Sequence, residues 1–493
     1  MSVTTPFVRL SNAASLPWED VPVWPVEVLV KNTSAELDRG GRVSAWFGVQ
    51  EGDATCIVAV LSLDAEKTLL VGRSHAFTGS YPSLTLIHPQ AHLFERELWE
   101  QHGLTPDGHP WLKPVRRTDG SAPANGIFFR VEGPEVHEVA VGPVHAGVIE
   151  PGHFRFQCVG EEVIHLEIAL GYQHRGIEEA LAGGPHRATC IQMEAIAGDT
   201  TIAHATAHAM LLESLAGTEA PLRAQWLRAL ALELERLANH TGDLGALAND
   251  VAFLPVSSAC GKIRGDFLNL TALMCGNRFG RGFVRPGGCR YDLEPQRMQQ
   301  FCERLQTAMI DVEQAASWFW DSASVRARFE NVGAVSMAQG VEIGLVGPAA
   351  RACGIAKDLR CDQPSGWHRS APVDPVIWSG GDVFARAKMR ALEIKQSGDY
   401  LAQQLFASPS DELRKEIAPP APDTLVVAMV ECWRGEVCHV AVTDAGGRFR
   451  RYKIVDPSFH NWTGLALSLR GTAISDFPIC NKSFNLSYCG FDL

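Results

Sequence analysis

The sequence predicts an α+β protein in which an N-terminal α/β domain precedes a mainly helical domain with small antiparallel sheets. Three patterns along the 493 residues support this fold class. Up to about Arg116, an amphipathic segment and short apolar segments typical of strands follow one another. Between residues 222 and 406, apolar residues recur at intervals of three and four, which indicates helices. From Thr424 the period changes to two, which indicates strands.

The N-terminal domain is predicted to contain a helix that ends near Leu37, three strands and a second helix at residues 92–103. The strands are expected at residues 42–50, 54–63 and 67–73. In the second helix, Leu93, Glu97 and Leu98 are expected to be buried either in the core of the domain or in an interface with a partner.

The stretch from Gly142 to Thr201 carries the most informative chemistry. Apolar and polar residues alternate over residues 164–170, as expected for a half-buried strand that stops at Gly171. The following residues place His174, Arg175 and Glu178 within five positions, beside Gly176, which tolerates positive φ. We expect this turn to direct charged groups into a cleft.

Three long helices are predicted next. The first two carry apolar residues at helical spacing, namely Leu222, Trp226, Leu230, Leu234 and Leu237, then Met298, Phe301, Leu305, Met309 and Val312. The third begins near Asp382 and ends near Phe406. Packed antiparallel, they would form a bundle with a seam that can hold a buried site.

The C-terminal region is predicted to form a small antiparallel sheet followed by an irregular tail. The expected strands are residues 425–433, 436–444 and 448–456, with a turn at residues 445–447. Residues 473–493 show no regular period, so the chain is expected to end in a free tail.

Composition limits the possible partners and locations. The formal net charge is −12 without a long basic run, which argues against a nucleic-acid partner. No segment approaches the ~18–20 consecutive apolar residues of a membrane-spanning helix. The N-terminus lacks the features of a secretory signal, so a cytoplasmic location is expected.

The thirteen scattered cysteines are interpreted as reduced core thiols. Residues 116–126 have linker composition, and we predict domains at 1–120 and 121–493.

Several motifs resemble the large, D-type subunit shared by respiratory complex I and the group 4 nickel–iron hydrogenases. They are GPVH (142–145), GEEV (160–163), GYQHRGIEE (171–179), ERLANHTGDLGA (235–246), VRPGG (284–288), GGDVFARAKMRALEI (380–394), ECWRGE (431–436) and DPSFHNW (456–462). Residues 94–116 are similar to the signature of the C-type subunit of complex I. The resemblance implies that one chain carries both a C-type and a D-type domain, as in the large subunit of formate-hydrogenlyase-type hydrogenases.

The nickel–iron centre that the resemblance implies requires four thiolates, supplied by two CxxC motifs. This chain has neither motif. The first pair would fall near Gly198 and Thr201, and the second pair falls where only Cys480 is present. A site assembled from Cys190, Cys480 and Cys489 is the alternative, but scattered buried thiols are the commoner case. We therefore assign no metal ligand to this chain.

The quinone site of complex I is also altered. His145 matches the first histidine of the quinone loop, whereas Ile149 and Gly198 occupy the positions of the histidine and tyrosine that contact the quinone. His145 and His174 remain as candidate cofactor-binding residues. Neither isoleucine nor glycine offers a side-chain hydrogen bond to a quinone oxygen.

Three charged residues that match the family active site are retained and are the candidate catalytic residues. Arg175 and Glu178 belong to an RGxE element whose glutamate has a proton-transfer role in hydrogenases, and Arg434 matches an active-site neighbour. A buried Glu178 carboxyl would have a raised pKa and could pass protons. The alternative is a structural ion pair of Glu178 with Arg175 or Arg434.

His204 and His208 stand four residues apart on one predicted helical face. This is the spacing of a metal-binding pair, but a third ligand is not evident from the sequence. We favour the interpretation that they are hydrogen-bonded histidines of the core or of an interface.

Together these features predict the large subunit of a membrane-associated oxidoreductase complex that lacks a nickel–iron site. Such a chain would couple electron transfer from an iron–sulfur subunit to proton or ion movement. Its expected partners are a small iron–sulfur subunit of the complex I B type, which would hold the Fe–S clusters, and antiporter-like and other membrane-arm subunits. These would place it on the inner face of the cell membrane. Two alternatives stay open: a non-catalytic coupling or scaffold subunit, and NADH or quinone oxidoreductase activity in a remodelled quinone cavity.

Overall fold

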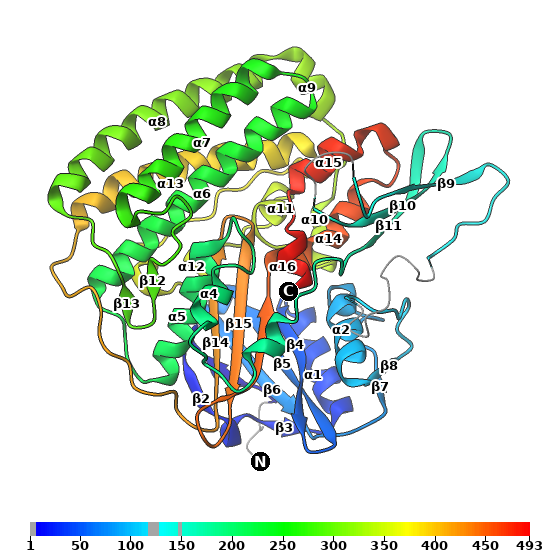
Figure 1. The fold of residues 1–493 in the computed structure, drawn as a ribbon. Coiled ribbons are helices and arrows are strands. Elements are labelled where there is room, and N and C mark those ends of the chain that lie inside the picture. The colour runs from blue at the N-terminus through cyan, green and yellow to red at the C-terminus, as the bar shows by residue number, and fades with distance from the viewer. Residues whose placement is uncertain (1–5, 117–127, 146–149) are drawn as a thin grey trace.

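The computed structural model describes residues 6–116, 128–145 and 150–493. A mixed sheet with two helices lies at one end, and a bundle of long helices lies at the other (Figure 1). A second sheet and the C-terminal helices lie between them (Figure 1). The α+β fold class predicted from the sequence is confirmed.

The N-terminal sheet has the strand order β1-β6-β5-β4, with β3 beside β6. Its strands are β1 (Val8–Leu10), β3 (Val23–Trp24), β4 (Arg42–Glu51), β5 (Ala54–Leu63) and β6 (Thr68–Ser74). All pairs are antiparallel except β3 with β6. Helices α1 (Val26–Asp38) and α2 (His92–His102) pack on this sheet. Short strands β7 (Ser80–Pro82) and β8 (Thr105–Asp107) form a parallel pair. The three predicted strands and both predicted helices are confirmed.

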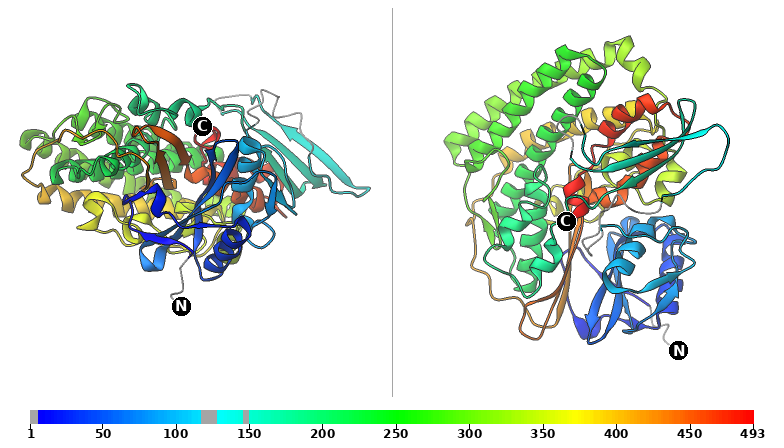
Figure 2. Two further views of the ribbon diagram at one scale, coloured as in Figure 1. Left: turned by 90° about the horizontal axis from the view of Figure 1, so that it is seen from below. Right: turned by 45° about the vertical axis from the view of Figure 1, so that its right-hand side comes forward.

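A three-stranded antiparallel sheet extends outward from the rest of the molecule (Figure 2). It consists of β9 (Val136–Val141), β10 (His153–Val159) and β11 (Glu162–Ala169). The last of these is the strand predicted by the alternation of residues 164–170. Two short helices follow, α3 (Ile177–Leu181) and α4 (Thr189–Met193).

Four long helices form the bundle. They are α6 (Leu222–Asp250), α7 (Leu254–Cys275), α8 (Pro295–Asp321) and α13 (Val383–Gln404). Helix α6 packs against both α7 and α13, and α7 packs against α8. The three predicted helices are confirmed, and α7 is an additional one. Shorter elements connect them: β12 (Val284–Arg285), β13 (Gly288–Cys289), α9 (Ala323–Phe329), α10 (Met337–Glu342), α11 (Gly347–Ala352) and α12 (Leu359–Asp362).

The second large sheet joins the two ends of the chain. Its order is β16-β15-β14-β2, formed by β2 (Ser15–Pro17), β14 (Thr424–Cys432), β15 (Gly435–Thr443) and β16 (Phe449–Val455). Helix α5 (Thr201–Leu215) packs on β14 and β15. All predicted strands of this region are confirmed, but the pairing of β2 with β14 was not expected. The boundary predicted near residue 120 lies outside the described residues and stays a prediction.

The prediction of a free C-terminal tail is wrong. The predicted tail forms α15 (Phe477–Phe484) and α16 (Tyr488–Asp492), which follow α14 (Pro457–Ser468), and Leu493 is only 2% exposed. Helix α15 has only eight residues and α16 only five, too few for a helical period to stand out in the sequence. The chain therefore ends inside the molecule, beside the turn that follows β11 (Figure 1).

The thirteen cysteines, all within the described residues, are free thiols, and most of them are buried. This confirms their interpretation as reduced core residues. Throughout the described part of the chain, every helix is too short or too polar to cross a membrane.

Candidate functional site

The turn between β11 and α3 requires glycine at two positions. Gly171 has φ of +99°, and an added Cβ would come within 3.1 Å of the Arg116 backbone. Gly176 has φ of +64° and precedes the first residue of α3. Both conformations favour glycine, because an L side chain is strained at positive φ. The turn is therefore fixed in shape and held close to the end of the N-terminal domain.

The C-terminal residues hold this turn in place. The Asp492 carboxylate accepts hydrogen bonds from the amides of Gly171, at 2.7 Å, and Gln173, at 2.8 Å. The backbone oxygen of Leu493 accepts one from the Arg175 amide at 2.6 Å. Burial raises the pKa of Asp492 to about 6, although the two amide bonds act in the opposite direction.

Arg175 and His174 bind backbone atoms in this arrangement. The Arg175 guanidinium donates to the carbonyl oxygens of Ala195, Ile196 and Cys489, at 2.7–2.9 Å. His174 Nδ1 lies 2.8 Å from the Asp492 carbonyl oxygen. Motif resemblance placed both residues at the site, but it did not indicate that the Arg175 side chain would connect separate segments.

Glu178 is buried and forms two ion pairs. Its carboxylate lies 2.9 Å from an Arg451 guanidinium nitrogen and 3.0 Å from Lys453 Nζ, and it accepts a hydrogen bond from the Ile454 amide. Burial alone would raise its pKa, but Lys453 and then Arg451 and Arg116 outweigh burial and lower the pKa to about 2.

Two expectations about Glu178 are therefore wrong. Its pKa is lowered rather than raised, and its partners are on β16 rather than being Arg175 or Arg434. The geometry of the strand explains this difference. Alternate residues of β16 point to the same side, so Arg451 and Lys453 both reach the Glu178 carboxylate. These partners are far from Glu178 in the sequence, so no local pattern could reveal them.

The N-terminal domain contributes a second carboxylate to the same cluster. Glu97 on α2 lies 2.6 Å from Lys453 Nζ and also pairs with Arg116. Lys453 is thus held between Glu97 and Glu178, and the three groups are nearly or completely buried. A cavity of about 240 Å³ adjoins them; its lining includes Glu178, Arg116, Arg451, His102 and His174. The expected cleft with charged walls is present at this turn.

Arg434 lies in the tight turn between β14 and β15 and pairs with Asp199. The guanidinium contacts both carboxylate oxygens of Asp199, at 2.6 and 2.7 Å, and donates to the Asn485 carbonyl oxygen. It also stacks over the Trp433 ring at 3.9 Å. Asp199 lies just before α5, in the segment where the resemblance places the first metal-binding cysteines. Its pairing with Arg434 could not be deduced from the sequence.

The residues at this position do not fit a nickel–iron centre. Thr201 and Gly198 supply no thiolate, although soft ligands are needed. Cys480 lies beside Gly333 and Arg386, and burial raises the pKa of its thiol to about 11.

His145 does not join either charged cluster. Its Nε2 lies 3.0 Å from the Gly152 carbonyl oxygen, and its ring lies 5.9 Å from the ring of Phe154. Ile149 lies outside the described residues. At Gly198, an added Cβ would meet no atom within 4 Å, so there is open space beside the position of the complex I tyrosine.

His204 and His208 belong to a buried hydrogen-bonded chain, which confirms the interpretation that they are core histidines. His204 contacts His439 and Asp456, and His208 contacts Tyr452. Sequence patterns did not single out His439, a single polar residue within an apolar strand, or Tyr452, which lies between Arg451 and Lys453 on β16. Only the pairing of β15 with β16 brings them to α5.

The seam of the helix bundle contains a network of ion pairs. Glu393 on α13 binds Arg236 and His240 on α6 and Arg351 on α11, at 2.8–3.1 Å. Arg351 also pairs with Glu431 on β14 at 2.8 Å. Every one of these groups is buried. The seam therefore holds a buried charged network that links the bundle to the second sheet.

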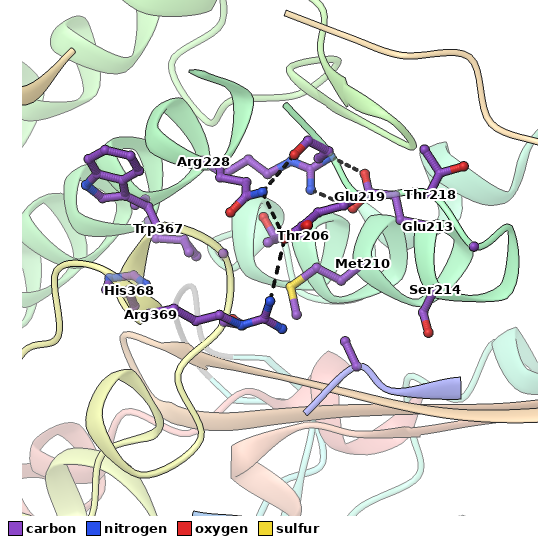
Figure 3. A pocket seen from close by; sticks show the side chains of 18 residues that line it. Thr206, Met210, Glu213, Ser214, Thr218, Glu219, Arg228, Trp367, His368 and Arg369 are labelled. Carbon is purple, nitrogen blue, oxygen red and sulfur yellow. Dashed lines mark hydrogen bonds and ion pairs between the residues drawn. The ribbon is translucent and has the colours of Figure 1, made fainter. Parts of the chain in front are cut away.

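A further cavity, of about 300 Å³, is lined by Thr206, Met210 and Glu213 of α5 (Figure 3), on the opposite face of this helix from His204 and His208. Arg228 and Glu213 form an ion pair of 2.6 Å in its wall. Trp367, His368 and Arg369 lie across the cavity from Glu213 (Figure 3). None of the candidate residues from the sequence lines it.

Comparison with known proteins gives matches over most of the chain. The family described as respiratory-chain NADH dehydrogenase, 49 Kd subunit, matches residues 250–420, and the 30 Kd subunit family matches residues 28–124. Carbon monoxide-induced hydrogenase of Rhodospirillum rubrum is 29% identical over 352 residues, which cover 71% of this chain and 97% of the relative.

Two further relatives belong to different kinds of complex. Formate hydrogenlyase subunit 5 of Escherichia coli is 27% identical over 488 residues, covering 94% of this chain and 84% of the relative. The D 1 subunit of NADH-quinone oxidoreductase from Roseiflexus is 28% identical over 364 residues, covering 71% of this chain and 96% of the relative. The similarity thus extends to both hydrogenase and quinone oxidoreductase subunits.

Proposed function

We propose that this chain, in which segments of the 30 Kd and 49 Kd subunit families of respiratory-chain NADH dehydrogenase are fused, is the large subunit of a membrane-associated oxidoreductase complex. The observation that carries this proposal is the match over 94% of the chain to formate hydrogenlyase subunit 5. Relatives of the NADH-quinone oxidoreductase type match only about 70% of the chain, and the N-terminal segment has its own family.

In this proposal the chain couples electron transfer from a small iron–sulfur subunit to proton or ion movement in antiporter-like and other membrane-arm subunits. These partners would hold the chain at the inner face of the membrane. The Fe–S clusters belong to the partner, and no nickel–iron centre is expected here, because Gly198, Asp199 and Thr201 supply no thiolate.

The retained charged residues receive different roles in this proposal. The pair of Arg434 and Asp199 marks the place of the reaction, at the position of the family active site. Arg175 and His174 position the turn, and Glu178 fixes the charge of the cluster at the domain interface. His145 would orient the loop that precedes β10.

A non-catalytic coupling subunit is the second candidate. This role is favoured by the ion pairs of Glu178 and Arg434, because both charged groups already bind protein partners and not a substrate. A reaction with a quinone in a remodelled cavity is favoured instead by the similarity to NADH-quinone oxidoreductase subunits. The two candidates differ in whether electrons reach this chain.

Purification of the intact complex from its native host tests both. We expect iron–sulfur signals by electron paramagnetic resonance, no stoichiometric nickel by elemental analysis, and neither production nor consumption of hydrogen. Reduction of the clusters followed by their reoxidation by quinone would support the reactive site. Stoichiometric nickel would overturn the assignment, and clusters that no acceptor reoxidises would favour the coupling role.

A further inference from the structure

An unbroken chain of hydrogen bonds runs between α5 and the second sheet. His208 Nδ1 lies 2.9 Å from the Tyr452 hydroxyl, which lies 2.9 Å from His439 Nδ1. His439 Nε2 lies 3.0 Å from His204 Nδ1, and His204 Nε2 lies 3.2 Å from the Asp456 carboxylate. All five side chains are at most 1% exposed. Five buried groups that can each bind and release a proton are thus in series.

The order of donors in this chain follows from its two ends. Burial lowers the pKa of His439 and of His208, to about 3 for His208, so both rings are neutral. Asp456 is ionised, because its bond to His204 and the nearby Arg434 outweigh burial and lower its pKa.

An ionised Asp456 accepts a hydrogen bond from His204 Nε2–H, which leaves His204 Nδ1 as an acceptor. His439 Nε2–H then donates to His204, and the Tyr452 hydroxyl donates to His439 Nδ1. His208 Nδ1–H donates to the Tyr452 oxygen, so His208 Nε2 carries no proton. The reverse order satisfies every group only if both nitrogens of His204 carry a proton, as in an imidazolium paired with the Asp456 carboxylate. The tautomer of each ring therefore distinguishes the two directions.

We propose that this chain is a directional proton relay that ends at Asp456, a role that rests on the proposed function because a redox reaction there needs protons. A proton that binds His208 Nε2 releases the Nδ1 proton to the Tyr452 oxygen. Tyr452 passes its own proton to His439 Nδ1, and His439 passes its Nε2 proton to His204. His204 passes its Nε2 proton to Asp456. One proton enters, one carboxyl is protonated, and no group keeps an excess charge.

The two ends of the chain have the properties that a relay requires. Asp456 lies within electrostatic reach of Arg434, Asp199 and Cys432, so a proton arrives beside the proposed reaction site. At the other end, His208 Nε2 is buried without a hydrogen-bond partner within the described structure. That end faces the Phe449 ring, and α4 lies nearby, because Cys190 on α4 is within electrostatic reach of Tyr452. A nitrogen left without a partner is the acceptor that the relay needs.

The protonation pattern is testable without any assay of turnover. The complex would be prepared with ¹⁵N-histidine in this chain and studied by solid-state nuclear magnetic resonance, with signals assigned through His204→Gln, His208→Gln and His439→Gln variants. We expect protonated Nε2 on His204 and His439, protonated Nδ1 on His208, and a coupling across the His439–His204 hydrogen bond. The opposite pattern, or a mixture of tautomers, would overturn the relay.

The transport role is tested by Tyr452→Phe, which removes the central hydroxyl and keeps the ring. Tyr400→Phe is the control, because it removes a buried hydroxyl that has no hydrogen-bond partner within the described residues and lies outside the chain. In the intact complex we expect turnover to fall at least about tenfold in Tyr452→Phe only, with an altered solvent isotope effect. Equal turnover of the two variants would overturn the relay. If the wild-type complex shows no redox turnover at all, the proposed function fails, and the resonance experiment still decides the protonation pattern.

Discussion

At the scale of single residues, the site differs from its sequence-based prediction mainly in the partners of charged groups. Motif resemblance identified Arg175, Glu178 and Arg434, and all three are held in place by specific contacts. It could not identify Lys453 or Asp199, because a residue in a strand or before a helix acquires its partner only through packing. The pKa of Glu178 is lowered rather than raised, since its burial was anticipated but the two cations of β16, Arg451 and Lys453, were not.

The lowered pKa of Glu178 predicts how the loss of stability caused by Glu178→Gln depends on pH. Its folded-state pKa of about 2 is below the ordinary 4.5, so Glu178 stabilises the fold above pH 4.5, and this contribution is lost as the pH falls through about 2. We expect Glu178→Gln to lower the stability of the protein in the complex by about 3 kcal/mol at pH 7. Thermal unfolding of both forms between pH 4 and 8 measures the difference.

This stability difference should be constant above pH 5 and begin to narrow only below about pH 4.5. Glu179→Gln is the matched control, because the adjacent Glu179 is exposed, and we expect little change there. A stability advantage of the wild type over Glu178→Gln that grows as the pH falls from 8 to 6 would mean that Glu178 has a raised pKa and would return it to the role of a proton carrier.

Arg434 should be sensitive even to a substitution that keeps its charge. A lysine cannot contact both oxygens of Asp199 and the Asn485 carbonyl oxygen together, because it lacks the planar fork of guanidinium. We expect Arg434→Lys to destabilise the protein by roughly 1–3 kcal/mol through lost buried hydrogen bonds. Arg326→Lys, in an exposed pair with Glu330, should change stability by less than about 0.5 kcal/mol. If chemical unfolding showed the same loss of stability for Arg434→Lys and Arg326→Lys, a structural role of the Arg434 guanidinium would be contradicted.

At the scale of elements, the periodic segments were predictable and the enclosed ones were not. The strands β4, β5 and β14 and the helices α6, α8 and α13 follow the spacing of their apolar residues. Helix α7 was missed because Gly261 and Gly265 and several small polar residues interrupt its apolar stripe. Helices α15 and α16 are too short for a helical period to stand out in the sequence.

The contact of α16 with the turn after β11 gives a prediction of opposite sign to that for Glu178. The pKa of Asp492 is raised from the ordinary 3.8 to about 6. The stability that this group contributes is therefore complete below pH 3.8 and is lost as the pH rises through about 6. Asp492→Asn, which cannot ionise, should gain about 3 kcal/mol relative to the wild type between pH 4 and pH 7.

Unfolding of the complex at pH 5, 6 and 8 measures this relative gain, and it should be complete by pH 8. Asp53→Asn, in the exposed connection between β4 and β5, is the control and should show no such trend. A constant difference between Asp492→Asn and the wild type across this range would mean that the carboxyl ionises as it does in the unfolded chain.

At the scale of the whole molecule, the N-terminal region and the rest of the chain are not independent bodies. Strand β2 from the N-terminal region completes the sheet of β14, β15 and β16. Lys453 on β16 is neutralised by Glu97 on α2 as well as by Glu178. The sequence suggested a domain boundary near residue 120 because residues 116–126 have the composition of a linker. Composition does not indicate which strands or charged residues pair across that boundary.

This interlocking predicts the result of cutting the chain between the two segments. A protease site inserted within residues 117–127 should be cleaved without separating the products, since the sheet pairing and the buried Lys453 do not involve the cut. Expressed without residues 1–116, the remaining chain should aggregate, because it exposes the edge of β14 and leaves Lys453 without Glu97. Glu97→Gln should weaken the association of the cleaved products, whereas Glu66→Gln, in an exposed pair, should not. Size-exclusion chromatography of the cleaved complex distinguishes these outcomes, and two separate monodisperse fragments would show that each family segment folds on its own.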